Sequence, residues 1–273
     1  MKTLKSFFLT LPIIFSLVAI QQANAADNST QINAIISETG FDELLEHVPE
    51  FAQNILKQSS GALDPKVNSS MSLAFKQAFA VSRVRSDVYN VINSHFDSAQ
   101  ANAYLNQLQS PMVRRISELE GSTNEPANRE AFIAFAQSLK KSPARAGRQA
   151  LIDRLDKATR ITEFGVDMQA AFFKAVFTAV NPVLDDDMRV GSDEMEKMVN
   201  EVRNSFSDAY KENTRTSYLF SFRDLSDAEL EAYIKLCESS DYRWGVQLLG
   251  NAMISALNQA ADRAALYMAQ ANQ

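Results

Sequence analysis

A helix–break–helix pattern that occurs twice is the feature that most constrains the fold of this chain. Residues 97–121 and 226–250 share one ungapped register, in which Tyr104 aligns with Tyr233. A helical hairpin needs helix caps and a break between its two helices. Both copies have these features at the same places, together with an aromatic residue. We therefore predict one helical-hairpin module that is used twice inside a globular protein, because two copies are too few for an extended repeat array.

The two copies agree in the residues that start and stop helices. Asp97 and Ser226 are N-cap residue types, and each has an acceptor side chain three positions later, which is the capping-box spacing. A second helix is expected after Ser110 in the first copy, where Pro111 follows, and after Ser239 in the second. Further matches in the same register are Arg114 with Arg243, Leu119 with Leu248, and Gly121 with Gly250.

Composition extends the helical prediction to the whole chain. Only eight Gly and seven Pro occur in 273 residues, and no convincing strand pattern is present. Apolar residues recur at three- and four-residue steps over 42–59 and from Pro65 through Ile92, which predicts two helices, with Pro49 expected to kink or divide the first. The fold class that follows is all-α: a multi-helix bundle or array with an internally duplicated hairpin.

The later part of the chain predicts more helices and one central one. We expect a loop at 121–128, a helix over 129–141, and another that starts at Ser142-Pro143. Residues 170–180 are apolar on nearly all sides, which predicts a helix at the centre of the core. Ser192 is expected to cap a further helix.

The first 25 residues have the features of a secretory signal peptide. Lys2 and Lys5 precede an apolar run over 7–20, and Ala23-Asn24-Ala25 is a small-x-small cleavage site. We therefore expect a periplasmic protein with no stable membrane span after signal cleavage. Residues 26–273 are expected to form a single all-α domain, with two pseudo-repeated halves, 26–121 and 129–273, as a finer expectation.

The net charge limits the classes of partner that the protein can bind, and the cysteine content excludes an intramolecular disulfide. The formal net charge of −6 makes binding to nucleic acid or to an anionic membrane surface unfavourable. Cys237 is the only cysteine, so the chain cannot form an intramolecular disulfide. A periplasmic protein or a hydrophobic ligand remains as partner, and the oligomeric state is left open.

Two motifs resemble those of exported proteins of Gram-negative bacteria that carry a helical domain of unknown function. They are Arg148-x-x-Leu151-Ile152-x-x-Leu155-Asp156-x-Ala158-Thr159 and Leu225-Ser226-x-x-Glu229-Leu230-x-x-Tyr233, with the break at Ser239. Cys237 and Ser239-Ser240-Asp241 depart from the aromatic residue and the Ser-Pro-x-Gly-like break that such proteins have. The resemblance implies a periplasmic location and an all-α fold, and it supplies no catalytic residues.

Candidates for catalysis or metal binding are few. His47 and His95 are the only histidines, and Ser138 has the S-x-x-K spacing to Lys141 without the other motifs of that enzyme class. Cys237 is expected to be a small buried residue, and the aspartates 185–187 lack the spacing of a calcium loop. No metal or cofactor site is expected.

Aromatic residues gather near the second copy of the hairpin. They are Tyr218, Phe220, Phe222, Tyr233, Tyr242 and Trp244. They could line a groove for a partner, or they could pack in the core, which is the usual role at this spacing. The candidate site comprises Tyr104, Arg114, Tyr233, Tyr242, Arg243 and Trp244. The function expected is a non-enzymatic binding or protein-interaction module of the cell envelope; the alternatives are an envelope hydrolase with an active site outside known motifs and a purely structural or oligomeric protein.

Overall fold

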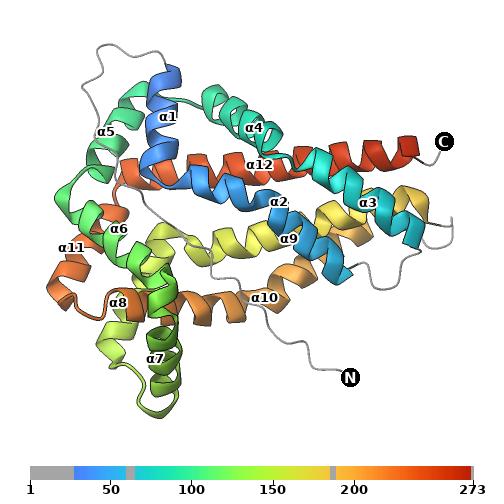
Figure 1. Ribbon diagram of the computed structural model, residues 1–273. Coiled ribbons are helices and arrows are strands. Elements are labelled where there is room, and N and C mark those ends of the chain that lie inside the picture. Colours follow the sequence, from blue (N-terminus) through green and yellow to red (C-terminus); the bar gives the residue numbers. More distant parts are fainter. Residues whose placement is uncertain (1–27, 60–64, 185–188, 272–273) are drawn as a thin grey trace.

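The computed structural model describes residues 28–59, 65–184 and 189–271, and within these ranges the protein is all-α, without strands (Figure 1). This confirms the predicted fold class. The predicted signal peptide and the aspartates 185–187 lie outside the described residues. The helices are α1 (Asn28–Glu38), α2 (Phe41–Ser59), α3 (Pro65–Ala78), α4 (Val81–Ser94), α5 (Ser98–Leu108), α6 (Pro111–Asn124), α7 (Arg129–Lys141), α8 (Ala146–Thr159), α9 (Ile161–Val180), α10 (Ser192–Ser221), α11 (Asp227–Cys237) and α12 (Ser240–Ala271), with short 3-10 helices at Pro126–Asn128 and Asn181–Val183.

Helices α9 and α12 form the centre of the molecule and pack along each other, with α10 on the other side of α9 (Figure 1). The apolar stretch 170–180 lies in α9, where Phe172, Ala175, Val176 and Ala179 are buried. The prediction that this stretch lies at the centre of the core is therefore confirmed. A helix that is apolar on nearly all sides must be covered by neighbours on all of them, and α2, α10 and α12 supply that cover.

Small side chains let several helices approach α12 closely. Ala252, Ala256, Ala260 and Ala264 are each fully buried. Their four-residue spacing places them on one face of the helix. Because methyl side chains keep the interhelical distance short, this face allows the close packing of α12 against α9, α3 and α4.

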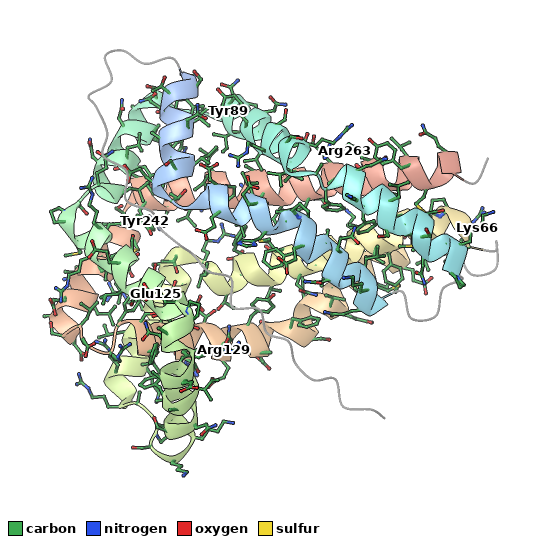
Figure 2. The ribbon with its side chains drawn as sticks, in the orientation of Figure 1. Lys66, Tyr89, Glu125, Arg129, Tyr242 and Arg263 are labelled. Atoms are coloured by element: carbon green, nitrogen blue, oxygen red, sulfur yellow. The ribbon has the colours of Figure 1, made fainter. Side chains whose placement is uncertain are left out.

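The helix predicted from Pro65 through Ile92 is wrong in one respect, because it is two helices. Ala80 has the extended dihedrals φ −56° and ψ 134°, which separate α3 from α4. Figure 2 shows Arg263 on α12, near the junction of α3 and α4. Its Nη2 donates to the carbonyl oxygen of Ala78 at 3.1 Å and also forms an ion pair of 2.6 Å with Asp87 of α4. One arginine thus holds the end of α3 and the middle of α4 on the same central helix.

Other predicted boundaries differ by a few residues. The loop expected at 121–128 is shorter, because α6 continues through Asn124 and the hydroxyls of Ser122 and Thr123 both donate to the Leu119 carbonyl at 3.0 Å. The helix expected at Ser142-Pro143 begins at Ala146. Helix α2 continues through Pro49 without division, and α10 begins at Ser192 itself, with Gly191 in the N-cap position.

The two predicted hairpins begin and break in the predicted register. Asp97 caps α5 by accepting from the backbone N–H groups of Ala99 and Gln100 at 2.9 Å, and Ser226 caps α11 in a complete capping box. The two copies then differ: α5 packs on α1 and α12, whereas α11 packs on α8, and α12 is far longer than α6. The common origin of the two hairpins stays a prediction.

Candidate functional site

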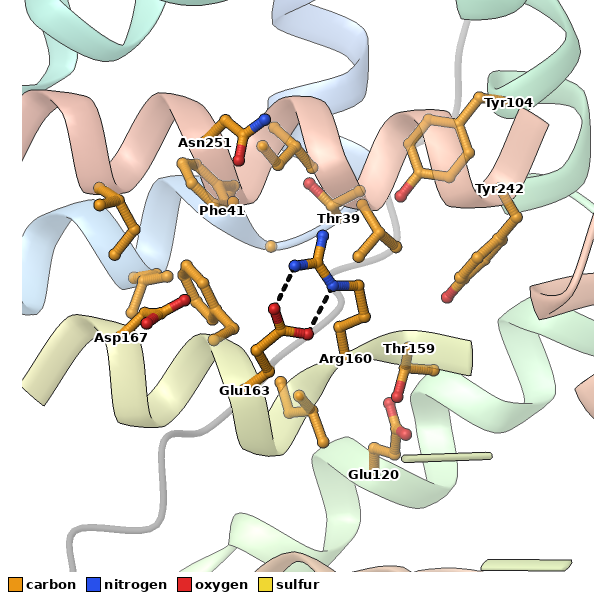
Figure 3. A pocket seen from close by; sticks show the side chains of 18 of the residues that line it. Thr39, Phe41, Tyr104, Glu120, Thr159, Arg160, Glu163, Asp167, Tyr242 and Asn251 are labelled. Carbon is orange, nitrogen blue, oxygen red and sulfur yellow. Dashed lines mark hydrogen bonds and ion pairs between the residues drawn. The ribbon is translucent and has the colours of Figure 1, made fainter. Parts of the chain in front are cut away.

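Segments from most of the described chain converge on a cavity of about 160 Å³ (Figure 3). Its walls come from the α1–α2 turn, α5, α6, the α8–α9 junction, α9, α10, α11 and the first half of α12. The apolar part of the wall consists of Phe41, Leu44, Ile161, Phe164, Val246, Leu249 and Ile254. No single hairpin forms this cavity, because both hairpins and the helices between them contribute to it.

Four buried tyrosines from four different helices line the cavity. Tyr104 and Tyr242 lie at right angles to each other, with ring centroids 5.5 Å apart and an interplanar angle of 80°, and their hydroxyl ends point toward the cavity (Figure 3). The hydroxyl of Tyr233 lies 3.4 Å from that of Tyr242. The hydroxyl of Tyr218 lies 3.1 Å from that of Thr159, which also lines the cavity. The cavity therefore has aromatic walls that also offer hydrogen-bonding oxygens.

A glycine in α12 makes room for one of these rings. A Cβ atom at Gly245 would lie 2.3 Å from Cε1 of Tyr104, closer than any real contact. The indole of Trp244 packs at 6.4 Å between centroids, at 80° to the Tyr104 ring. Tyr104 is thus fixed against α12 by a residue without a side chain and by a neighbouring ring.

Glu120 of α6 is the acidic group among the tyrosines. Burial raises the pKa of its carboxyl to about 8, so the group is mostly protonated at neutral pH. In Figure 3 this carboxyl lies beside Thr159. Burial also raises the pKa values of Tyr218, Tyr233 and Tyr242. The inner wall consequently carries groups that are neutral at neutral pH.

The buried Cys237 belongs to the same cluster. Its side chain is fully buried, as expected from the sequence, and burial raises the pKa of the thiol to about 12. Hydrogen bonding to Tyr233 and Tyr242 partly offsets that rise. The thiol is therefore protonated and shielded, which does not suit a nucleophile.

The turn between α8 and α9 places charged residues at the cavity. Arg160 has left-handed dihedrals, φ 56° and ψ 25°, which are unfavourable for a residue with a side chain. Asp156 stabilises the turn by accepting from the backbone N–H of Thr162 at 3.0 Å. The Arg160 guanidinium then forms a two-pronged ion pair with Glu163, whose Nε–Oε2 distance is 2.7 Å (Figure 3).

The ion pairs at this turn satisfy the charges near the cavity mouth. Arg160 and Glu163 are both partly exposed, and the guanidinium holds the pKa of the Glu163 carboxyl below its usual range. Asp167, another lining residue, accepts from Nε of Arg203 on α10 at 3.0 Å. The outer part of the cavity is therefore polar, while the inner part is aromatic.

The structure brings together half of the residues predicted for the site. Tyr104, Tyr233 and Tyr242 line the cavity, and Trp244 packs behind Tyr104 outside the lining. Arg114 and Arg243, which matched in the repeat, are both exposed and absent from the lining.

Other aromatic residues of the predicted groove have separate places. Phe222 is fully buried and stacks on Tyr218 with centroids 5.4 Å apart. Phe220 packs on Phe132 and Phe135 of α7, both at 5.4 Å. Core packing, the alternative interpretation of the aromatic set, therefore accounts for the two phenylalanines.

Sequence reasoning missed the polar members of the site. Glu120 lies four residues after Ile116, in a helix whose sequence has an ordinary amphipathic pattern. Arg160 lies at a junction of two helices, without the glycine that usually indicates a left-handed residue. Thr39 and Gly40 at the α1–α2 turn were also missed. The Leu155-Asp156-x-Ala158-Thr159 motif was a usable signal, because its polar residues build the turn that carries Arg160.

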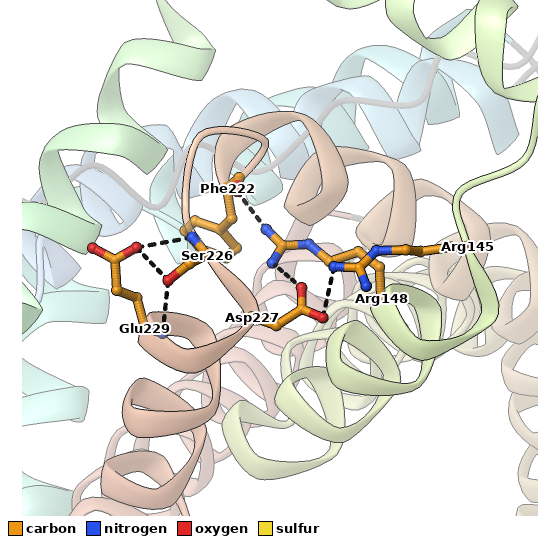
Figure 4. Close-up of polar contacts among 6 residues, drawn as sticks. All are labelled: Arg145, Arg148, Phe222, Ser226, Asp227 and Glu229. Atoms are coloured by element: carbon orange, nitrogen blue, oxygen red, sulfur yellow. Dashed lines mark hydrogen bonds and ion pairs between the residues drawn. The ribbon is translucent and has the colours of Figure 1, made fainter.

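A second polar cluster ties α8 to the start of α11 (Figure 4). Arg148 is buried, and it donates from Nη1 to Oδ1 of Asp227 at 3.0 Å and from Nη2 to the backbone oxygen of Phe222. Arg145 adds an ion pair of 2.7 Å to the other oxygen of Asp227. These contacts join the start of α8 to Asp227 of α11 and to the carbonyl of Phe222 before it, so the cluster holds these segments together.

The other catalytic candidates are engaged in local contacts at exposed positions. The ring of His95 contacts the Ser94 hydroxyl and the Val91 carbonyl, at 2.9 and 3.0 Å. The hydroxyl of Ser138 donates to the Phe135 carbonyl at 2.7 Å. His47 lies 3.8 Å from Glu50 on the solvated side of α2. The Ser94 hydroxyl also donates to the Val91 carbonyl at 2.8 Å, so the contact between Ser94 and His95 belongs to the end of α4, and none of these residues lines the cavity.

The described ranges contain neither a helix suited to cross a membrane nor a cluster of side chains suited to bind a metal ion. None of the helices in these ranges combines the length and apolar character that crossing a bilayer requires. The same part of the chain contains no group of three or more His, Cys, Asp or Glu side chains placed to hold a metal ion.

Comparison of the chain with protein-family models, with curated proteins and with solved structures finds no match.

Proposed function

We propose that this protein is a non-catalytic binding protein of the cell envelope, which holds a small ligand, or one end of a larger one, in the tyrosine-lined cavity. The observation that carries the proposal is the convergence of four buried tyrosines, from α5, α10, α11 and α12, on one cavity. Such a combination of aromatic walls and a few polar groups is typical of ligand sites. Location in the periplasm is part of the proposal and rests on the signal-peptide features of residues 1–25 and on the resemblance to exported helical proteins.

The size of the cavity limits the ligand. A volume of about 160 Å³ is close to that of an engineered cavity of ~150 Å³ that binds benzene. It is smaller than the ~300–1,000 Å³ of ordinary drug-sized sites. A ring or a short branched group fits, whereas a folded partner protein can insert no more than one side chain.

The polar groups require that the ligand also forms hydrogen bonds. The hydroxyls of Tyr104 and Tyr242 point toward the cavity, and the Glu120 carboxyl borders it (Figure 3). A purely apolar ligand would displace water from these oxygens without replacing its hydrogen bonds, which costs affinity.

Titration with phenol, followed by protein-observed NMR and calorimetry, tests the proposal. We expect saturable chemical-shift changes at Tyr104, Tyr242 and the α8–α9 junction. Val246→Phe should abolish them, because Val246 lines the cavity and a larger ring there fills it. Leu266→Phe is the matched control, since Leu266 lies on the same helix at an exposed position outside the lining.

Two results would contradict the proposal. One is the absence of any saturable shift in the wild-type protein. The other is binding that Val246→Phe leaves unchanged while circular dichroism shows that the variant is folded, because the ligand would then bind elsewhere.

A further inference from the structure

We infer that the ligand of the tyrosine-lined cavity is a small organic cation, an ammonium group with a compact apolar body. This inference rests on the proposed function, because it names the chemical class of the ligand for the same cavity. Three features of the lining support it. The ionisable groups of the inner wall can become negative but not positive, the hydroxyl ends of Tyr104 and Tyr242 point toward the cavity, and Arg160 is already paired with Glu163.

The titratable groups of the inner wall can become negative but not positive. They are Glu120 on α6, Tyr104 on α5, Tyr218 on α10, Tyr233 with the nearby Cys237 on α11, and Tyr242 on α12. Glu120 interacts electrostatically with Tyr218, Tyr233, Tyr242 and Cys237. A cation placed among these groups would be attracted to the tyrosine oxygens and would favour the ionised form of Glu120, whereas an anion would be repelled by that ionised form.

The tyrosine oxygens meet at one side of the cavity, where a cation can lie against them. Tyr104 and Tyr242 meet at 80°, and the Tyr233 hydroxyl adjoins that of Tyr242 at 3.4 Å. The hydroxyl ends of Tyr104 and Tyr242 point toward the cavity, so their oxygens present partial negative charge to a cation that lies there (Figure 3). A cavity of about 160 Å³ suits a compact ammonium group better than a long chain.

The positive charge in the lining does not favour an anionic ligand. Arg160 is the only Lys or Arg among the lining residues of the cavity, and Glu163 already holds its guanidinium through two contacts. Asp167 also lies in the lining. A carboxylate ligand would have to displace Glu163 and then lie close to Asp167.

Three isosteric probes separate charge from shape. Choline, 3,3-dimethylbutan-1-ol and 3,3-dimethylbutanoate share a trimethyl head and differ in charge, being cationic, neutral and anionic. At about pH 9, where Glu120 is mostly ionised, we expect choline to bind about tenfold or more tightly than the neutral alcohol, because only the cation is attracted to the carboxylate and the tyrosine oxygens. We expect the anion to bind most weakly, as measured by calorimetry.

Substitution of the carboxyl connects the preference to its cause. At about pH 9, Glu120→Gln should weaken choline binding about tenfold and leave the neutral alcohol nearly unchanged, because only the cation interacts with the ionised carboxyl. Glu118→Gln is the matched control, since Glu118 is exposed on the same helix. Choline affinity of the wild type should rise as the pH increases through about 8, where Glu120 ionises, and should level above that range. Glu120→Gln should lose that pH dependence.

The outcomes distinguish this inference from the proposed function. If the neutral alcohol binds as tightly as choline, the cavity binds ligands but does not select cations, and the inference fails alone. Tightest binding of the anion would assign the site to Arg160 and would also overturn it. If neither these probes nor phenol binds, the proposed function fails as well.

Discussion

At the scale of single residues, the site depends on contacts between residues that are far apart in the sequence. Tyr104 lies in the first predicted hairpin and Gly245 in the second, yet the Tyr104 ring occupies the space that a side chain at Gly245 would fill. The register of the repeat identified Tyr104 and Tyr233 as candidates, and the cluster of aromatic residues near the second hairpin identified Tyr242, because both patterns are visible in the sequence. The need for glycine at position 245 was not visible, since it arises from the approach of another helix.

Two glycine substitutions should therefore have opposite effects. We expect Gly245→Ala to lower the free energy of unfolding by about 1–3 kcal/mol, because the methyl group forces the Tyr104 ring to move in a packed interior. Gly121→Ala, in α6, has no atom within 4 Å of the added Cβ and should instead raise it by about 0.5–1 kcal/mol through helix propensity. Urea unfolding followed by circular dichroism measures both. If both substitutions changed the free energy of unfolding equally, the contact between Tyr104 and Gly245 would not contribute to stability.

At the scale of helices, local signals predicted where most helices begin, and tertiary contacts decided where some of them end. The caps at Asp97 and Ser226 and the proline at Pro111 start helices at the predicted positions. These signals act within one helical turn, so they can be found in the sequence. The break between α3 and α4 has no glycine or proline, and the contact at Ala78 comes from Arg263, more than a hundred residues later.

Arg263 is the residue to substitute if this contact holds the two helices on α12. We expect Arg263→Met to lower the free energy of unfolding by about 2–3 kcal/mol, because Asp87 loses its ion-pair partner at a mostly buried position. The methionine keeps the apolar stem of the arginine in place. Arg243→Met, an exposed arginine on the same helix, should change it by less than about 0.5 kcal/mol.

Hydrogen exchange gives a second measure of the same contact. Amides near the end of α3 and around Asp87 in α4 should exchange faster in Arg263→Met than in the wild type, since local opening there becomes easier. A uniform change over the whole chain would mean that Arg263 contributes to global stability without holding this junction.

At the scale of the whole molecule, the cavity exists only when the helices are assembled. Its walls come from eight helices and from two turns, which include the left-handed Arg160. Helical periodicity specifies which face of each helix is buried, but it does not specify which buried faces meet. This is why the sequence predicted the all-α class and three of the tyrosines, and why it did not predict Glu120, Arg160 or the α1–α2 turn as their neighbours.

The assembled cavity should make the stability of the molecule depend on pH through Glu120. The pKa of this carboxyl is about 8 in the folded protein, above its ordinary value of 4.5, so the folded state binds the proton more tightly than the unfolded state. Its contribution is therefore fully present below about pH 4.5 and is lost as the pH rises to about 8. The slope has an upper limit of about 1.4 kcal/mol per pH unit, which water in the cavity would reduce.

Urea unfolding of the wild type and of Glu120→Gln at a series of pH values measures this contribution. The glutamine cannot ionise, so the wild type should become less stable than the variant by at least about 1 kcal/mol between the acidic and the alkaline ends of that range. Glu118→Gln should follow the wild-type curve, because Glu118 is exposed on the same helix. Parallel curves for the wild type and Glu120→Gln would mean that the Glu120 carboxyl has an ordinary pKa in the folded protein. The pH dependence expected for choline binding would then lose its basis, while the preference for a cation over its neutral isostere would remain a separate test.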